Sequence, residues 1–257
     1  MMTFVRFGDM TFEEIAEAAA EGAIAVVPTG CTEQQGPHLA VDNDTWFAES
    51  LAVAAAEQVA PDVIAVVLPA LPFGPTTEHR GFGAGFVDIP VPVYEQFVRS
   101  ILDSLADQGF ARILVWRGCG GHDLVATVLA FNHDRDGVSR AFLPAHPFHD
   151  VWCSIADPAV PGGHADSFTT SILLHRRPNA VRTDRIPDQV SDEPDWADPH
   201  LDFSAVSSTG VIGSAAHASP DLGRALWRAS VNAVADVLRQ IETDPDTVHV
   251  RPTMPLE

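Results

Sequence analysis

Apolar and polar residues follow one another along this chain in blocks that predict alternating strands and helices. Short apolar runs predict strands at residues 24–28, 62–71, 112–116 and 141–143, with a weaker one at 86–91. Runs with apolar residues at helical spacing predict helices at residues 11–20, 46–59, 93–108, 123–132, 169–175 and from 219 onward. A rhythm of strand, loop and helix predicts an α/β fold with a mostly parallel central sheet.

Local signals refine three of these helices. Thr11 and Glu14 have the spacing of a capping box, in which each side chain bonds the backbone N–H of the other residue. Pro220 stands in the first turn of the last helix, where its missing N–H is harmless. In the helix at 93–108, the spacing predicts one buried face formed by Phe97, Ile101, Leu102 and Leu105.

The remaining segments contain no periodic pattern. Residues 147–170 are expected to be irregular up to the helix at 169–175, and residues 186–212 to form a loop rich in Asp, Pro and Ser. The chain contains no repeat and no low-complexity linker. We therefore expect one domain over residues 1–243, followed by a frayed tail over residues 244–257.

The composition narrows the class of partner. The 35 acidic and 15 basic residues give a formal net charge of -20, which argues against nucleic acid and anionic membranes as partners. No apolar run approaches the roughly 20 residues of a membrane helix, and no signal peptide is evident. The three cysteines, an odd number, form no disulfide framework. These features predict a reduced, cytoplasmic protein.

The loop at residues 29–44 contains the densest chemistry in the chain. It follows an apolar strand and brings together Glu33, His38, Asp42 and Asp44, punctuated by glycine and proline. In open α/β sheets, ligands bind at the carboxyl ends of the strands. We therefore expect this loop to bind a metal ion or a small polar substrate, although Asp44 could instead cap the helix that follows.

Three further loops, at residues 78–80, 118–123 and 162–166, combine polar side chains with nearby glycines. In an α/β fold all four loops could converge on one edge of the sheet. Carboxylate, imidazole and thiolate groups are transition-metal ligands, and a metal with an open position activates water and polarises carbonyls. Spacing alone remains a weak signal, because the chain contains no H-E-x-x-H, paired C-x-x-C or G-x-S-x-G motif.

Taken in order, the four stretches resemble the creatininase family of metal-dependent amidohydrolases. The family pattern G-[ST]-x-E-Q-H-G-P-H-L-P-L-x-T-D stands here as G-C-T-E-Q-Q-G-P-H-L-A-V-D-N-D at residues 30–44. The motif G-x-x-x-E-H matches residues 74–79, with Phe82 following, and N-G-H-G-G-N stands as R-G-C-G-G-H at residues 117–122. H-A-G-x-x-E-T-S stands as H-A-D-S-F-T-T-S at residues 164–171. Part of the chain also resembles the mycofactocin-maturation peptidase branch.

The resemblance implies a single three-layer αβα domain that hydrolyses a C–N bond. The bond would belong to a small cyclic amide or a peptide-like substrate, in a biosynthetic pathway. It also implies homo-oligomers, often hexamers, and two divalent metal ions held by acidic and histidine side chains.

Several positions depart from the family pattern. Glu33 and Asp44 match metal-binding positions of the pattern. Gln35 and Cys119 replace histidines, and Thr169 replaces a glutamate. Glutamine is a poor transition-metal ligand, whereas a cysteine thiolate is a good one. These changes make creatinine itself an unexpected substrate.

Three hypotheses follow from these departures. In the first, one Zn, Mn or Fe ion per chain is held by Glu33, Asp44 and Cys119, with His122 as a further ligand. His164 or His122 would then pass a proton to the leaving nitrogen. In the second, no metal is bound, Cys119 is the nucleophile, one of the same histidines is the base, and Glu33 orients the site. In the third, the protein is a non-catalytic relative that binds a ligand or an active partner.

The remaining candidates would line the site. Glu78 and His79 are expected in the catalytic pocket, because they match the second motif. His38, Gln35 and Trp152 are expected to contact a small-molecule or short-peptide substrate. Each has a purely structural alternative, such as a loop histidine or a core tryptophan.

Overall fold

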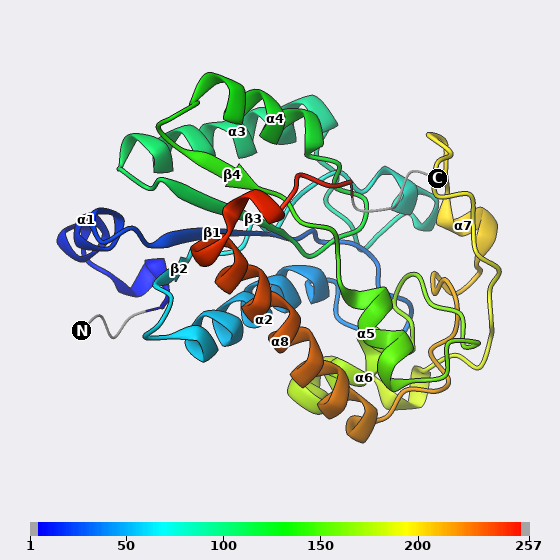
Figure 1. The fold of residues 1–257 in the computed structure, drawn as a ribbon. Helices are drawn as coiled ribbons and strands as arrows, with labels where there is room; N and C mark the ends of the chain where they lie inside the picture. Colours follow the sequence, from blue (N-terminus) through cyan, green and yellow to red (C-terminus); the bar gives the residue numbers. More distant parts are fainter. Residues whose placement is uncertain (1–4, 253–257) are drawn as a thin grey trace.

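A four-stranded parallel sheet forms the centre of the molecule in the computed structural model, which describes residues 5–252 (Figure 1). The strands are β1 (Ile24–Thr29), β2 (Ala65–Val67), β3 (Arg112–Arg117) and β4 (Arg140–Phe142), in the order β2-β1-β3-β4. The central pair runs in register from Ile24↔Arg112 to Thr29↔Arg117. The carboxyl ends of β1 and β3 therefore lie side by side at one edge.

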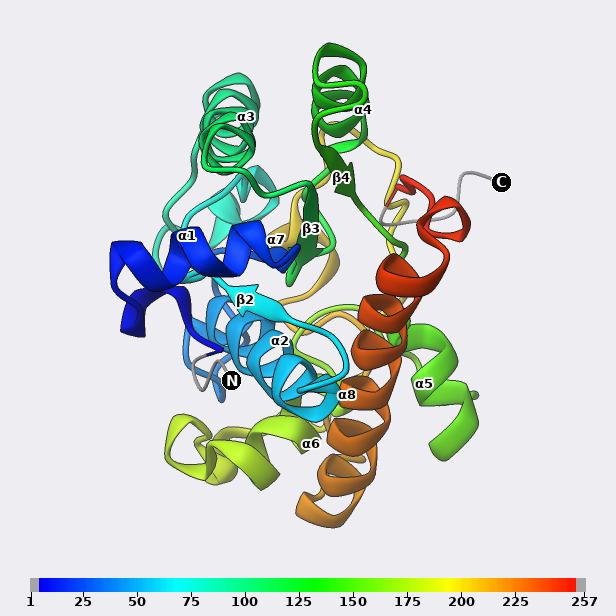
Figure 2. The same ribbon diagram turned by 60° about the vertical axis from the view of Figure 1, so that its left-hand side comes forward.

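Helices cover both faces of the sheet, which confirms the α/β fold (Figure 2). One face carries α1 (Phe12–Ala20), α3 (Val91–Asp107) and α4 (Val125–Asp134); the other carries α2 (Asn43–Val59), α5 (Phe148–Ile155), α6 (Ser167–Arg176) and α8 (Pro220–Thr243). Alternate residues of β1 enter different cores: Ile24 and Val26 pack with α2 and α8, whereas Ala25 and Val27 pack with α1 and α3. This alternation is what a strand buried on both faces requires.

The residues predicted to cap the first and last long helices form these caps in the structure. Thr11 and Glu14 form both bonds of the capping box of α1. The side chain of Ser219 accepts a hydrogen bond from the Leu222 N–H, and Pro220 occupies the first turn of α8.

The structure contradicts several local predictions. Residues 147–170 are not irregular throughout, because α5 forms there, with Val151 buried in the core that α2, α6 and α8 form against the sheet. Residues 86–91 form only an isolated bridge between Gly74 and Asp88, and α3 begins at Val91. In α3 the buried face is formed by Tyr94, Val98, Leu102, Leu105 and Ala106. Phe97, at the edge of that stripe, stays 53% exposed.

The segment after α8 is docked rather than frayed, as far as residue 252. Val248 is buried, and the Arg251 N–H donates to the Leu143 carbonyl at 2.8 Å. Arg117 at the end of β3 also donates to the Arg251 carbonyl, at 3.0 Å. The prediction for residues 253–257 lies outside the described residues. A short helix, α7 (Phe203–Val206), interrupts the loop predicted at 186–212 and packs against the turn at Thr77–Phe82.

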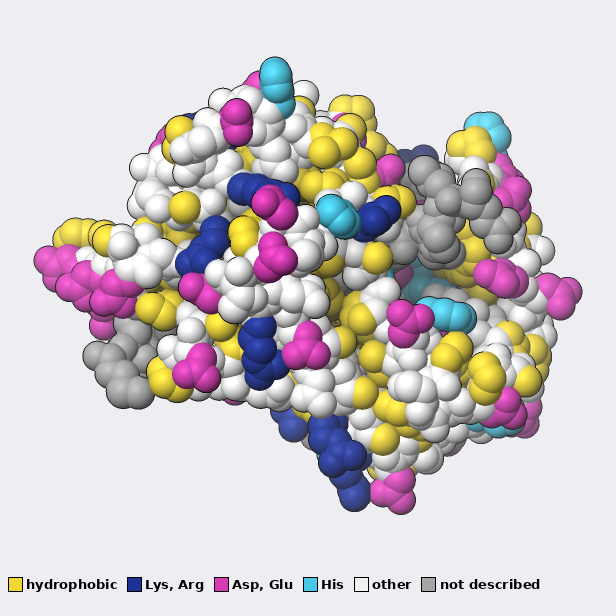
Figure 3. Space-filling model, in the orientation of Figure 1, with side chains coloured by type: hydrophobic (Ala, Val, Ile, Leu, Met, Phe, Trp, Pro, Cys, Tyr) yellow, Lys and Arg dark blue, Asp and Glu magenta, His cyan; other side chains and the backbone are white. Residues whose placement is uncertain are grey.

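The surface seen in Figure 3 carries single arginines interspersed with acidic side chains. Within residues 5–252, no helix combines the length and the apolar character that a membrane crossing needs.

Candidate metal centre

The predicted loops converge where β1 and β3 end, at the edge where α/β folds bind ligands. The first turn of α2 packs onto this edge and brings Asp44 to it. Two glycines make that approach possible. A Cβ on Gly30 would lie 2.6 Å from the Thr45 nitrogen, and one on Gly118 would lie 2.7 Å from the Asp44 carbonyl oxygen.

Two thiols and two carboxyls meet at this edge, with one sulfur or oxygen atom of each within 4.8 Å of the others. Cys31 Sγ lies 3.0 Å from Glu33 Oε2 and 3.1 Å from Asp44 Oδ2. Cys119 Sγ lies 3.8 Å from the same Glu33 oxygen. The structure thus brings together three of the four predicted ligands, Glu33, Asp44 and Cys119, and adds Cys31.

The environment of this cluster favours its protonated forms. Burial raises the pKa of Glu33 to about 7, and burial together with the charge of Glu33 raises the pKa of Asp44 to about 8. Burial also raises the pKa of Cys31 well above its usual value. A hydrogen bond with Cys31 lowers the pKa of Cys119, but burial and the neighbouring carboxyls outweigh it and raise that pKa to about 12. A cation bound among these groups would replace their protons.

Gln35 connects the two carboxyls where the family pattern has a histidine. Its Nε2 donates to Glu33 Oε1 at 3.3 Å and to Asp44 Oδ2 at 3.1 Å. Its Oε1 is buried and makes no hydrogen bond within the described part of the chain. An unsatisfied buried carbonyl oxygen beside two carboxyls is an unusual arrangement, and a cation near it would satisfy it.

Gln34 determines which ring nitrogen of His79 carries the proton. The Gly36 N–H donates to Gln34 Oε1 at 2.9 Å, which identifies the amide nitrogen as the atom facing the Gly210 carbonyl at 3.0 Å and His79 Nδ1 at 3.1 Å. His79 Nδ1 is therefore an acceptor. In the neutral ring the proton must then be on Nε2, which lies 3.2 Å from Glu33 Oε2.

His164 has the opposite arrangement. Its Nε2 lies 2.7 Å from the backbone carbonyl of Gln34, which can only accept, so Nε2 carries the proton. Its Nδ1 lone pair then faces Glu33 Oε1 at 3.4 Å. Burial lowers the pKa of His164 to about 4, so the ring is neutral near neutral pH. Glu78 lies at the rim, 21% exposed, with Oε1 3.6 Å from His79 Nε2.

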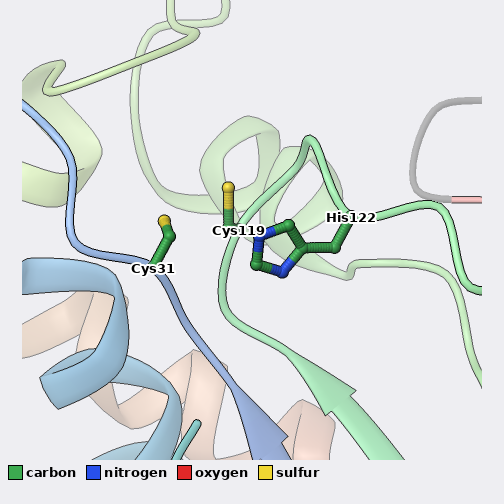
Figure 4. A group of neighbouring side chains, drawn as sticks. All are labelled: Cys31, Cys119 and His122. Atoms are coloured by element: carbon green, nitrogen blue, oxygen red, sulfur yellow. The ribbon is translucent and has the colours of Figure 1, made fainter. Parts of the chain in front are cut away.

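His122 lies on the thiol side of the cluster (Figure 4). Its ring is next to Cys119 and has a nitrogen within 4.8 Å of both the Cys31 and Cys119 sulfurs. Its Nδ1 is 3.1 Å from the Tyr94 hydroxyl. Burial lowers the pKa of His122 to about 4, although a hydrogen bond with the Pro75 backbone partly opposes this.

Two predicted substrate contacts have other partners here. His38 is fully buried and bonds Thr170 Oγ1 through Nε2 at 2.8 Å, which links the first loop to α6. Trp152 packs against the core formed by α2, α6 and α8, and its indole N–H donates to the Asp157 carbonyl at 3.2 Å. Their roles as substrate contacts stay predictions.

Sequence reasoning did not single out Cys31 and Gln34. Cys31 follows Thr29 by two residues, just as Cys119 follows Arg117, and Thr29 pairs with Arg117. That correspondence needs the strand register, which the sequence does not reveal. Gln34 is one position from the residues singled out, but only its contacts with His79 and His164 show what it does.

Comparison with known proteins places this arrangement in context. The family model described as creatinine amidohydrolase matches residues 8–238. A mycofactocin precursor peptide peptidase of Mycolicibacterium smegmatis is 32% identical over 228 residues, covering 86% of each chain. A creatinine amidohydrolase of Pseudomonas putida is 25% identical over 266 residues, covering 93% of this chain and 98% of its own.

Solved structures agree on the fold. The crystal structure of a creatinine amidohydrolase matches with a TM-score of 0.79 and 21% identity, covering 93% of this chain and 98% of its own. Of two further creatininase structures, one is described with Mn and the other as Zn-Zn type. Their TM-scores are 0.77 and 0.75.

Proposed function

The chain belongs to the creatininase family of metal-dependent C–N hydrolases, and we propose that it is an amidohydrolase acting through one divalent metal ion per chain. The observation that carries the proposal is that Glu33, Asp44 and Cys119 each place a donor atom within 4.8 Å of the others, at the edge where the sheet strands end. Such a donor set suits Zn or Fe. We propose a peptide-like C–N bond as the substrate, with a small cyclic amide as the second class.

The sulfur and oxygen atoms of the thiol–carboxyl cluster lie close enough together to hold one ion. Glu33, His79 and His164 form a second group within 4.8 Å of one another, to which we assign proton handling instead of a second ion. Ligand bonds of about 2.0–2.3 Å give a tetrahedral site donor separations of roughly 3.3–3.8 Å. The distance of 3.8 Å from Cys119 Sγ to Glu33 Oε2 lies at the top of that range, and the distances of 3.0 and 3.1 Å from the neighbouring Cys31 Sγ to the two carboxyls lie just below it. Gln35, at a histidine position of the family pattern, donates its amide N–H groups to the carboxyls instead of offering a ring nitrogen. That substitution removes a ligand that a second ion would need.

A divalent ion held here would polarise a substrate carbonyl and acidify water. The chain supplies the proton handling on the other side of Glu33. His164 is neutral and presents the Nδ1 lone pair, so it can take a proton and return it to the leaving nitrogen. His79 presents an Nε2–H that can donate to a developing negative charge. Gln34 holds both rings in these complementary forms.

The thiol geometry favours this function over a metal-free cysteine nucleophile. Nucleophilic cysteines need a depressed pKa, from a neighbouring positive charge or a helix N-terminus. Here burial and carboxyl neighbours raise the pKa of Cys119 to about 12, so without a cation the thiol keeps its proton. The nearest imidazole, that of His122, has its pKa lowered to about 4, so it supplies no positive charge that would ionise the thiol near neutral pH.

Metal analysis and turnover together test the proposal. The purified protein is loaded with Zn²⁺, Fe²⁺ or Mn²⁺, and hydrolysis is assayed by mass spectrometry with short peptides, cyclic amides and creatinine. We expect about one ion per chain and cleavage of a peptide-like or cyclic amide. Glu33→Gln should abolish turnover, whereas the control Glu57→Gln, an exposed position on α2, should not.

The other outcomes decide between the alternatives. Two ions per chain would refute the single-ion site. Turnover without metal, lost on Cys119→Ala, would favour thiol chemistry. Metal-loaded protein with no turnover would indicate a binding role. The expected homo-oligomer also stays a proposal, and light scattering on the same preparation would test it.

A further inference from the structure

Cys31 and Cys119 face each other across the central strand pair. Thr29 pairs with Arg117, and the Gly118 N–H still donates to the Thr29 carbonyl at 2.6 Å, so the pairing continues past both strand ends. Two residues further along each chain segment comes a cysteine. Both are buried, at 0% and 6% exposure, and Figure 4 shows their side chains on neighbouring segments. The register of the two strands therefore places the two thiols next to each other.

This pair is also where the chain departs twice from the family pattern. The pattern described above has serine or threonine at position 31 and histidine at position 119. A thiolate is a softer metal ligand than a hydroxyl or an imidazole. Both changes therefore make the site more suitable for soft metal ions. One change alone could be incidental to packing. Two changes at facing positions suggest a shared ligand.

The contacts of Cys31 indicate what that ligand is. Its sulfur reaches carboxyl oxygens of both Glu33 and Asp44, at 3.0 and 3.1 Å. A thiol has one hydrogen and can donate to only one of these oxygens at a time. A cation in place of the hydrogen attracts both carboxylates and both sulfurs together.

We propose that Cys31 is a metal ligand alongside Cys119, so that this centre binds its ion through two thiolates and prefers thiophilic ions such as Zn²⁺ over Mn²⁺. The proposal rests on the metal-dependent function proposed above and names the ligand that sets metal choice. With Glu33 and Asp44 the donors number four, and a hydrolytic site must leave one position for water. Asp44 is the least buried of the four and also accepts from Asn43 and Gln35, so its carboxylate could yield that position to water while its charge still favours the ion.

Cobalt spectroscopy tests this without relying on turnover. Co²⁺ added to the reduced, metal-free protein gives a near-ultraviolet charge-transfer absorption whose intensity scales with the number of thiolate ligands. We expect the full band in the unsubstituted protein and about half in Cys31→Ser and in Cys119→Ser. Cys153→Ser, which alters the exposed thiol on α5, is the matched control and should leave the band unchanged. Circular dichroism establishes that each variant is folded.

Competition between ions provides a second measurement. Zn²⁺ and Mn²⁺ are titrated against the same proteins, and the preference for Zn²⁺ should fall at least tenfold in Cys31→Ser. A full cobalt band in folded Cys31→Ser would overturn the proposal while leaving the single-ion function intact. A protein that binds neither Co²⁺ nor Zn²⁺ would refute the proposed function itself. A Cys31–Cys119 disulfide that forms in the presence of Zn²⁺, seen by peptide mass mapping, would also overturn it.

Discussion

Replacing Gly30 with alanine should separate the first turn of α2 from the edge of the sheet. The new Cβ would lie 2.6 Å from the Thr45 nitrogen and 2.7 Å from its Oγ1, where ordinary contacts begin near 3.4 Å. The nearest atom is the Thr45 Cα, which is backbone and cannot rotate away as a side chain could, so α2 must move by about 1 Å. Overpacking of this kind costs about 1–3 kcal/mol, and the reduced freedom of the unfolded chain offsets only about 0.4–1 kcal/mol.

The midpoints of these ranges leave a net loss of about 1.3 kcal/mol, which corresponds to a fall in Tm of roughly 3–5 °C for a domain of this size. Because Asp44 is on the displaced turn, metal affinity should fall by about tenfold or more, which is about 1.4 kcal/mol. Calorimetry of the metal-free protein and Zn²⁺ titration measure the two effects. Gly8→Ala is the matched control, because its Cβ would approach only Pro69 Cγ, at 3.9 Å. A Gly30→Ala protein with unchanged Tm and affinity would refute this account.

Three further predictions concern stability. The metal-free protein should lose about 2 kcal/mol between pH 6.5 and 8, measured by urea unfolding, because the folded state keeps a proton on Asp44 up to about pH 8 that the unfolded state has already lost. The pKa of His164 is lowered to about 4, so this residue adds stability only as pH rises from about 4 to about 6.5 and does not offset the loss. A stability that stays constant between pH 6.5 and 8 would contradict the raised pKa of Asp44. Gly223→Ala should lower Tm although alanine favours helices by about 1 kcal/mol, since its Cβ would overlap the Ser171 carbonyl of α6; a higher Tm would show that the helix contact is loose. Ser219→Ala should cost about 1 kcal/mol in the same unfolding assay by removing the α8 cap, and no change would mean that water replaces it.

Much of the fold could be predicted from the sequence because its signals are local. The strand at Ile24–Thr29 and the helix from Pro220 follow from apolar runs, capping residues and proline placement. Where packing decides, local signals fail. Phe97 has the spacing of a core residue, yet the buried stripe is defined by Tyr94 and Val98. Phe148–Ile155 form a helix whose apolar face becomes evident only from its packing beside α2 and α8.

The candidate centre divides in the same way. Residue types and order in the sequence identified Glu33, Asp44 and Cys119, because motif chemistry is a property of the residues themselves. The presence of Cys31 beside Cys119 depends on the register between two strands 88 positions apart, as in Thr29↔Arg117. The complementary proton positions on the two imidazoles depend on Gln34, whose side-chain amide donates to His79 and whose backbone carbonyl accepts from His164. Register and hydrogen-bond direction are relations between distant segments, so they exist only once the chain has folded.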